Sequence, residues 1–157
     1  MKYSFVDYDP VLHRALDDWR SEAIARFAMD GPISEEWQYY LDAPEYRAGE
    51  NAFCKVVLLN NQPIAVMIVF CNLEHPVNIN PIAVDPARTG QGHGSAILRE
   101  FVEHIDAILP FHSGRMEMVI DNENTAAIHV AEKAGFVRVR EHPDGDVANY
   151  ELTVCKP

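Results

Sequence analysis

Residues 83–98 constrain the fold more than any other part of the chain. They join an apolar strand to an amphipathic helix through three glycines spaced two apart, Gly90, Gly92 and Gly94. Glycine lets the backbone turn through positive φ and lets a ligand approach without meeting a Cβ. The first turn of a helix also leaves backbone amides unpaired, and its dipole favours negative charge. The pattern therefore predicts a site for a phosphate or pyrophosphate.

Hydrophobic periodicity around this loop predicts a domain that mixes strands and helices. One helix is expected from Asp9 and Pro10 to Gly31, on an apolar stripe at helical spacing, and a second from Ser34. An amphipathic helix is expected after the glycine loop, ending at Pro110, and another helix from the capping residue Asn124 to Gly135. Strands are expected over 2–8, 53–59, 64–71, 77–84, 116–120, 136–140 and 147–154. A hairpin turn is expected over Asn60-Asn61-Gln62-Pro63, and a bulge or missing ladder bond at Pro81.

Composition narrows the class of protein. A chain of 157 residues predicts one domain over 1–157, and its net charge of −11 argues against a nucleic-acid partner. The negative charge is explained either by solubility or by a preference for a cationic substrate such as an amine. The longest apolar run, 64–71, is too short to cross a bilayer, and no signal peptide is evident. Three widely spaced cysteines and histidines without ligand spacing predict no disulfide framework, no metal and a cytoplasmic location.

Three phosphate ligands compete for the glycine loop. A nucleoside triphosphate loop needs a lysine after its last glycine, and this loop has none. A dinucleotide loop needs the spacing G-x-G-x-x-G after the first strand, whereas here the spacing is G-x-G-x-G after three strands. The missing lysine and the glycine spacing do not exclude a third class, another phosphorylated ligand.

Two motifs together resemble the signatures of the GNAT acyltransferase superfamily. The first, TGQGHG at 89–94, resembles its pyrophosphate loop and follows Val84-Asp85-Pro86. The second, NTAAIHVAEKAGF at 124–136, resembles the family pattern N-x-x-A-x-x-L-Y-x-K-x-G-F. The resemblance implies a mixed, largely antiparallel sheet of about seven strands flanked by about four helices. It also implies that the strands at 83–84 and 116–120 splay apart around acetyl-CoA.

The resemblance implies roles for individual residues. Amides of the loop would hold the pyrophosphate, main-chain groups of Ile82 and Val84 would pair with the pantetheine, and the amide near Val84 would polarise the thioester carbonyl. The expected cofactor-binding residues are Ile82, Ala83, Val84, Arg88, Thr89, Gly90, Gln91, Gly92, His93, Gly94, Ser95, Asn124, Ala127 and Lys133. For the side chain of His93, a solvent-facing position is favoured over a phosphate contact.

The chain departs from the family pattern at its catalytic positions. Thr89 replaces the usual Gln or Arg, and Ala131 stands where many members carry a tyrosine that protonates the leaving thiolate. Asn78 falls where some members keep a glutamate base. The catalytic candidates are therefore Asn78, Glu74 and Tyr40, with His75, Asp121 and Tyr39 as further options. Trp37, Tyr39 and Tyr40 are candidates for the wall of the acceptor pocket.

The expected function is N-acetyl transfer from acetyl-CoA to a primary amine by direct attack. The acceptor is a small molecule or a peptide. The competing hypothesis is a non-catalytic acyl-CoA-binding or regulatory module, motivated by alanine at position 131 and asparagine at position 78. The sequence leaves the oligomeric state open, with a homodimer among the options.

Overall fold

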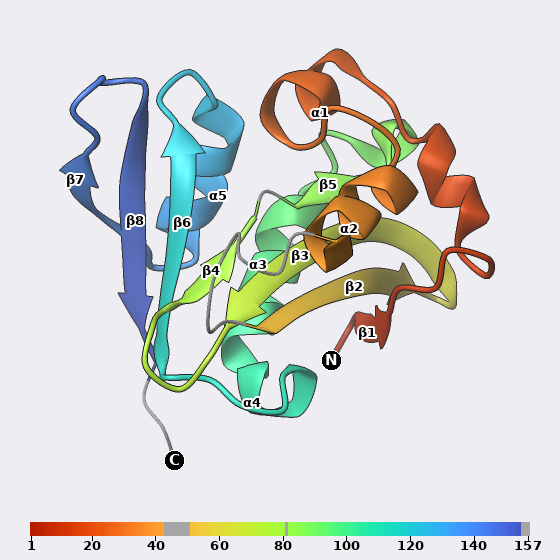
Figure 1. Cartoon of the computed structure of the whole chain (residues 1–157), viewed down its shortest axis with the longest axis horizontal. Helices are drawn as coiled ribbons and strands as arrows, with labels where there is room; N and C mark the ends of the chain where they lie inside the picture. The colour runs from red at the N-terminus through yellow and green to blue at the C-terminus, as the bar shows by residue number, and fades with distance from the viewer. Residues whose placement is uncertain (43–50, 81, 155–157) are drawn as a thin grey trace.

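A mixed sheet of eight strands forms the centre of the protein in the computed structural model, which describes residues 1–42, 51–80 and 82–154 (Figure 1). The strands are β1 (Ser4–Asp7), β2 (Asn51–Leu59), β3 (Gln62–Cys71), β4 (Val77–Ile79), β5 (Ala83–Val84), β6 (Arg115–Asp121), β7 (Val137–Glu141) and β8 (Val147–Thr153). Their order is β1-β2-β3-β4-β6-β8-β7, with β5 beside β3. The β4–β6 pair is parallel and the other pairs are antiparallel. The expected mixed, largely antiparallel fold is confirmed, with eight strands in place of about seven.

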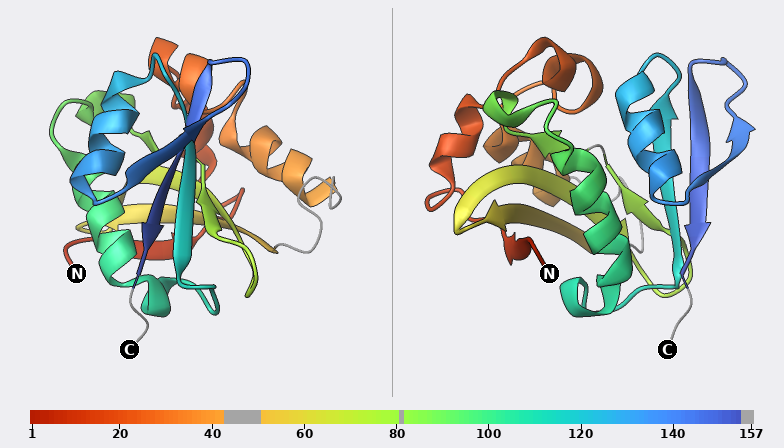
Figure 2. Two further views of the ribbon diagram at one scale, coloured as in Figure 1. Left: turned by 90° about the vertical axis from the view of Figure 1, so that its left-hand side faces the viewer. Right: turned by 180° about the vertical axis from the view of Figure 1, so that it is seen from behind.

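Helices cover both faces of this sheet. Within the described residues these are η1 (Arg14–Asp18), α1 (Glu22–Phe27), α2 (Ile33–Asp42), η3 (Pro86–Arg88), α3 (His93–Glu103), α4 (Ile105–Ile108) and α5 (Thr125–Lys133), where η marks a 3-10 helix. In Figure 1, α2 lies in front of β3, α1 lies above it, and α3 lies behind it, as the reverse view in Figure 2 shows. No helix in the described part of the chain is long and apolar enough to cross a membrane.

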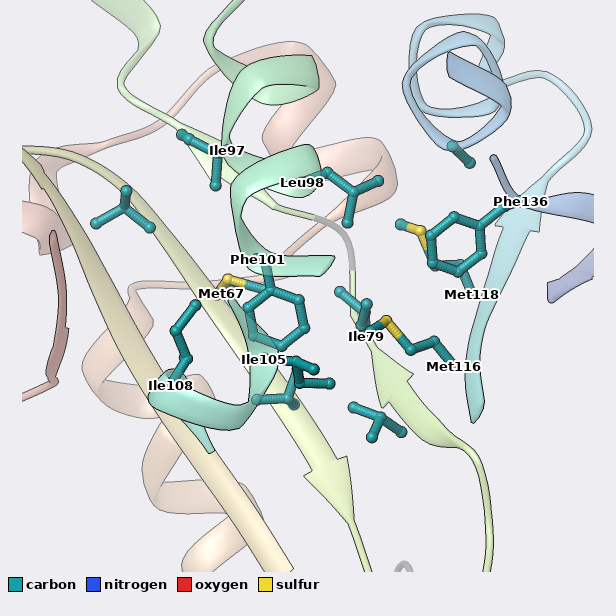
Figure 3. Packing of buried hydrophobic residues seen from close by; sticks show 14 of the residues in the cluster. Met67, Ile79, Ile97, Leu98, Phe101, Ile105, Ile108, Met116, Met118 and Phe136 are labelled. Carbon is teal, nitrogen blue, oxygen red and sulfur yellow. The ribbon is translucent and has the colours of Figure 1, made fainter. Parts of the chain in front are cut away.

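The two faces of the sheet bury separate hydrophobic clusters, because successive side chains of a strand point to opposite faces. Met67 of β3, Met116 of β6 and Phe101 of α3 belong to one cluster, in which Met67 lies beside Phe101 and Met116 lies beside Ile79 (Figure 3). Ile68 and Phe70 of β3 belong to the cluster on the other face, under α1 and α2. β3 is therefore buried on both faces, which explains its nearly unbroken apolar sequence.

The expected helix from Asp9 to Gly31 is wrong as a single element. Asp9 does accept hydrogen bonds from the amides of Val11 and Leu12, at 2.8 and 2.9 Å, but they close a turn. A 3-10 helix follows, and the backbone then becomes extended at Trp19. Ser21 begins α1, since its Oγ accepts a hydrogen bond from the amide of Ile24 at 3.1 Å. A second capping serine inside the apolar stripe therefore divides it in two.

The long helix after the glycine loop also divides, at His104. That residue leaves helical geometry with φ −116° and ψ 25°, and its carbonyl accepts the first hydrogen bonds of α4. The change of direction lets Ile105 and Ile108 continue into the core already filled by α3. The end of the helical region before Pro110 is confirmed, since Leu109 is extended.

The hairpin turn predicted over residues 60–63 is confirmed, but it is limited to Asn60 and Asn61, because Gln62 and Pro63 already pair with β2 as part of β3. Both asparagines adopt positive φ, 51° and 63°, and β2 pairs with β3 directly across them. Asparagine tolerates this left-handed region better than most residues. The turn was predictable because its chemistry is local.

The strand expected over 77–84 is instead two short strands with a register shift between them. Ile79 of β4 pairs with Val69 of β3, whereas Ala83 of β5 pairs with Val66. The register on β3 therefore shifts by one residue between its pairing with β4 and its pairing with β5. The bulge or missing ladder bond was expected at Pro81, which lies outside the described residues, so it stays a prediction.

Candidate functional site

The sheet opens between β6 and the segment that leads into the glycine loop (Figure 1). β4 pairs with β6 at Val77 and Asn78, whereas β5 is paired with β3 and, in the described residues, has no ladder partner in β6. The register on β3 shifts by one residue where this change of partner occurs, since the chain continues beside β3 as β5 and leaves β6. The splay expected between these two strands is present.

The glycine loop lies directly beyond this opening. Gly90 and Gly92 adopt positive φ, 81° and 80°, and a Cβ built on either would meet no other atom within 4 Å. Gly92 is the N-cap of α3, and the first hydrogen bond of that helix runs from the amide of Ala96 to its carbonyl at 3.2 Å. The amides of residues 93–95 therefore precede the helical ladder and form the positive end of the helix dipole. Such a helix start has the chemistry of an anion site.

Gly94 has a different role from the other two loop glycines. A Cβ at this position would lie 3.7 Å from Cγ2 of Val130 in α5. That distance is an ordinary van der Waals contact, so a methyl group would fit here, where α3 packs beside α5. The packing of these helices brings the two sequence motifs together in space, although about thirty residues separate them.

Arg88 is engaged with its neighbour Asp85. Its Nε lies 3.7 Å from Oδ2 of Asp85, whose Oδ1 accepts a hydrogen bond from the amide of Ala87 at 3.0 Å. Thr89 donates its hydroxyl hydrogen to the carbonyl of Pro86 at 3.1 Å. These contacts fix the turn before the loop. A phosphate would have to compete with Asp85 for the Arg88 guanidinium.

His93 does not point into solvent, so the expectation for its side chain is wrong. It is half-buried, and its Nδ1 lies 2.9 Å from the hydroxyl of Tyr3, which is almost fully buried. Glu100, two turns further along α3, accepts hydrogen bonds from the amides of Lys2 and Tyr3 at 2.6 and 3.0 Å. The start of the chain is therefore bound to the helix that begins at the loop.

The second motif forms α5 and part of the core. Asn124 caps the helix, since its Oδ1 accepts a hydrogen bond from the amide of Ala127 at 3.2 Å. Ala131, at the position of the usual tyrosine, is completely buried in the main core cluster. Lys133 is exposed in the last turn. The motif therefore supplies a helix cap and core packing, while its cofactor contacts stay a prediction.

The three catalytic candidates lie in different places. Asn78 is 5% exposed, and its Nδ2 donates a hydrogen bond to Oε1 of Glu117 at 3.2 Å. Glu74 is exposed in the turn before β4, at the opposite end of that strand from the glycine loop. Tyr40 lies on α2 beside Phe70, with ring centroids 5.0 Å apart. The structure thus brings Asn78 and Tyr40 to one region and leaves Glu74 outside it.

The sequence reasoning did not single out Glu36 for the site. This residue lies on α2 at the face that carries Ile33 and Tyr40, and its Oε1 accepts a hydrogen bond from the Tyr40 hydroxyl at 3.2 Å. Burial raises the pKa of its carboxyl group, the hydrogen bond from Tyr40 lowers it, and the charge of Asp30 raises it further. A carboxylate at a core-facing position of an amphipathic helix was the available signal.

An open hollow of about 730 Å³ lies elsewhere, between α5 and the strands β7 and β8. Its lining includes Ile128, Phe136, Arg138 and Tyr150, and none of the predicted site residues. The described residues contain no group of three or more His, Cys, Asp and Glu side chains arranged to hold a metal ion. The candidate site is therefore assigned from the loop and the opened sheet.

Comparison with known proteins places this geometry in context. Residues 13–136 match the model described as the acetyltransferase (GNAT) family. A spermidine N-acetyltransferase from Vibrio cholerae, solved with CoA and spermine, has 16% identity and a TM-score of 0.74, with coverage of 97% of this chain and 95% of that one. The aminoglycoside acetyltransferase AAC(6')-Ib, solved with acetyl-CoA, has 19% identity and a TM-score of 0.75, with coverage of 98% and 94%.

A third similar structure is an acetyltransferase from Salmonella typhimurium that modifies the N-terminal serine of ribosomal protein L7/L12. It has 17% identity and a TM-score of 0.73, with coverage of 98% of this chain and 96% of that one. No curated protein sequence matches the chain. At these identities the structures establish the shared fold, and the family match covers most of the chain.

Proposed function

Because the chain belongs to the GNAT family of acetyltransferases, we propose that its glycine loop and opened sheet bind acetyl-CoA and present the acetyl group to a primary amine. Acetyl-CoA is the acetyl donor in this family. The observation that carries the proposal is the pair Gly90 and Gly92, which hold positive φ and leave open space before the start of α3. A pyrophosphate fits that combination of space, free amides and dipole.

The cofactor would bind along the open edge of β5. The amides of residues 93–95 would hold the pyrophosphate, and Arg88 would exchange Asp85 for a phosphate oxygen. Main-chain groups of Ile82 and Val84 would pair with the pantetheine amides, since β5 is paired with β3 on its other side. The amide near Val84 would then polarise the thioester carbonyl. Positioning supplies most of the rate in such a site.

The acceptor would reach the carbonyl from the side of the sheet that carries α2. An unprotonated amine attacks the thioester carbon, a C–N bond forms, the C–S bond breaks, and CoA leaves as the thiol after proton transfer. Ala131 has no proton to donate, so the usual tyrosine acid is missing here. Removal of one general acid typically lowers a rate by about 10²–10⁴-fold without abolishing it.

The similar proteins suggest which amines to test. They act on spermidine, on aminoglycosides and on a protein N-terminal serine. The net charge of −11 suits a cationic acceptor such as these. A single domain over 1–157, a cytoplasmic location, a homodimer and the absence of a nucleic-acid partner stay predictions from the sequence.

Calorimetric titration with acetyl-CoA, with CoA, ATP and NAD as controls, tests the cofactor assignment. Micromolar binding of acetyl-CoA and CoA, without binding of ATP or NAD, is expected. Thiol release with spermidine, kanamycin and a serine-initiated peptide then tests the transfer. Binding without thiol release from any amine would favour the non-catalytic acyl-CoA-binding module, for which Ala131 is the motive. No binding of acetyl-CoA would refute both.

A further inference from the structure

α2 carries a carboxylate on its core-facing side. Ile33 is 1% exposed, and Tyr40 is partly buried against the cluster beneath α1 and α2. Glu36 is three residues after Ile33 and four before Tyr40, so the three share one face of the helix. Apolar packing does not explain a half-buried carboxylate in this position.

Two sets of contacts hold this helix in place. At its start, Asp17 of η1 accepts hydrogen bonds from the amide and the hydroxyl of Ser34, at 3.0 and 2.8 Å. Further along, the ring of Tyr40 packs edge to face on Phe70 of β3, with an interplanar angle of 78°. The position of Glu36 relative to the sheet is therefore fixed by tertiary contacts on both sides of it.

The Tyr40 hydroxyl connects this carboxylate to the opening of the sheet. It donates to Oε1 of Glu36 at 3.2 Å and accepts a hydrogen bond from Nδ2 of Asn80 at 3.4 Å. Asn80 directly follows β4, and its amide donates to the carbonyl of Ile68 at 3.0 Å. Two hydrogen bonds thus link Glu36 to the point at which the sheet separates.

Strand register places further polar groups on the same face. Asn78 pairs with Phe70 of β3 and with Glu117 of β6, and paired residues direct their side chains to one side of a sheet. Phe70 contacts Tyr40 of α2, so this is the α2 side. Glu36 and Glu117 are therefore two carboxylates near the same opening, both bonded to neutral donors.

We infer that Glu36 binds the ammonium group of the acceptor and takes its proton, and that Tyr40 is a positioning residue that holds this carboxylate. The inference rests on the proposed transfer to an amine. The ammonium R–NH₃⁺ gives one proton to the Glu36 carboxylate and becomes R–NH₂, which attacks the thioester carbon. The C–N bond forms, the C–S bond breaks, and the nitrogen passes its extra proton to the departing CoA sulfur. Glu36 then returns its proton to water.

The charges around Glu36 suit this role. Burial moves the pKa of its carboxyl group upward, toward the operating pH, where a proton acceptor is most effective. Asp30 acts in the same direction. Among the other charged groups nearby, Asp17 is engaged with Ser34, and Arg20 donates to the carbonyls of Gly31 and Met29, at 2.7 and 3.2 Å.

Glu36→Gln tests the inference, with Glu35→Gln as the matched control. Glu35 is the exposed neighbour on the same helix and changes the net charge equally. Activity is measured as thiol release with spermidine, kanamycin and a serine-initiated peptide, from pH 5 to 9. The Glu36 variant should lose about 10²-fold or more in kcat/KM. It should also lose the acidic limb of the pH profile, with acetyl-CoA affinity unchanged by calorimetry. The Glu35 variant should match the original protein.

Tyr40→Phe keeps the ring contact with Phe70 and removes the hydroxyl. It should lower kcat/KM by about tenfold, the size of one hydrogen bond, and should shift the acidic limb without removing it. An unchanged rate and pH profile in Glu36→Gln would overturn the inference and leave the proposed function intact. Failure of the original protein to release thiol with any of the three amines would overturn both. A Glu36 variant that lost acetyl-CoA binding as well would show a structural role and would also overturn the inference.

Discussion

Replacement of Gly92 by alanine separates the conformational role of the loop from its ligand role. Gly92 has φ 80°, and a Cβ there meets no protein atom within 4 Å. The left-handed conformation costs an L-residue about 1–2 kcal/mol, and the loss of glycine's freedom in the unfolded chain offsets about 0.4–1 kcal/mol of this. We therefore expect a net loss of stability of about 1 kcal/mol, or a fall in Tm of about 2–4 °C for a chain of this length.

The larger effect should be on acetyl-CoA. The new Cβ would occupy the space before the first turn of α3 and would hold the pyrophosphate away from the amides there. Loss of two hydrogen bonds to a charged group, at about 1.5–3 kcal/mol each, corresponds to more than 100-fold in Kd. Gly92→Val should abolish measurable binding, because its branched side chain fills more of this space.

Gly145→Ala is the matched control for this prediction. Gly145 has φ 77°, also has no atom within 4 Å of a built Cβ, and lies in the turn between β7 and β8. It should show the same fall in Tm and an unchanged Kd for acetyl-CoA, measured by calorimetry on both variants. Equal affinities for the Gly92 and Gly145 variants would refute the assignment of the pyrophosphate to this loop.

Three further predictions concern single residues. Asn124→Ala should lower the free energy of unfolding in urea by about 1 kcal/mol through loss of the cap, and should weaken acetyl-CoA binding; an unchanged Kd would make Asn124 a cap alone. Tyr8→Phe should be neutral or stabilising by up to about 1 kcal/mol, because the Tyr8 hydroxyl is buried without a hydrogen-bond partner in the described residues; a clear loss of stability would reveal a partner. Burial raises the pKa of the Cys54 thiol from 9.0 to about 12. The unfolded chain therefore loses this proton first, so stability should fall as pH rises from 9 toward 12, by up to about 1.4 kcal/mol per unit. The free energy of unfolding, measured in urea, should fall less between pH 8 and pH 10 for Cys54→Ala than for the original protein. An equal fall in both proteins would contradict the assignment of this pH dependence to Cys54.

The sequence by itself determined the features whose chemistry is local. The positive φ values of Gly90 and Gly92, the Asn60–Asn61 turn and the Asn124 cap each depend on one or two residues and their immediate neighbours. The two motifs at 89–94 and 124–136, in that order, were enough to indicate the family.

The tertiary structure decided the features that depend on distant partners. The stripe from Leu12 to Phe27 fits one helix, yet Leu12 is 78% exposed and the capping Ser21 begins a new helix within it. His93 was expected in solvent, and its partner Tyr3 is ninety residues away in the chain. Local spacing carries no information about such a contact.

The candidate site shows the same division. Its glycine loop could be predicted from the sequence, because the conformation of the glycines and of the helix start depends on adjacent residues only. The opening beside the loop exists because β3 pairs with β4 and β5 in two registers, one residue apart. Glu36 and Asn80 are linked through the Tyr40 hydroxyl, because α2 packs on β3. The two residues are far apart in the sequence. The sequence thus determined the glycine loop to which we assign the pyrophosphate, and long-range strand register and helix packing decided which polar side chains lie near the opening beside it.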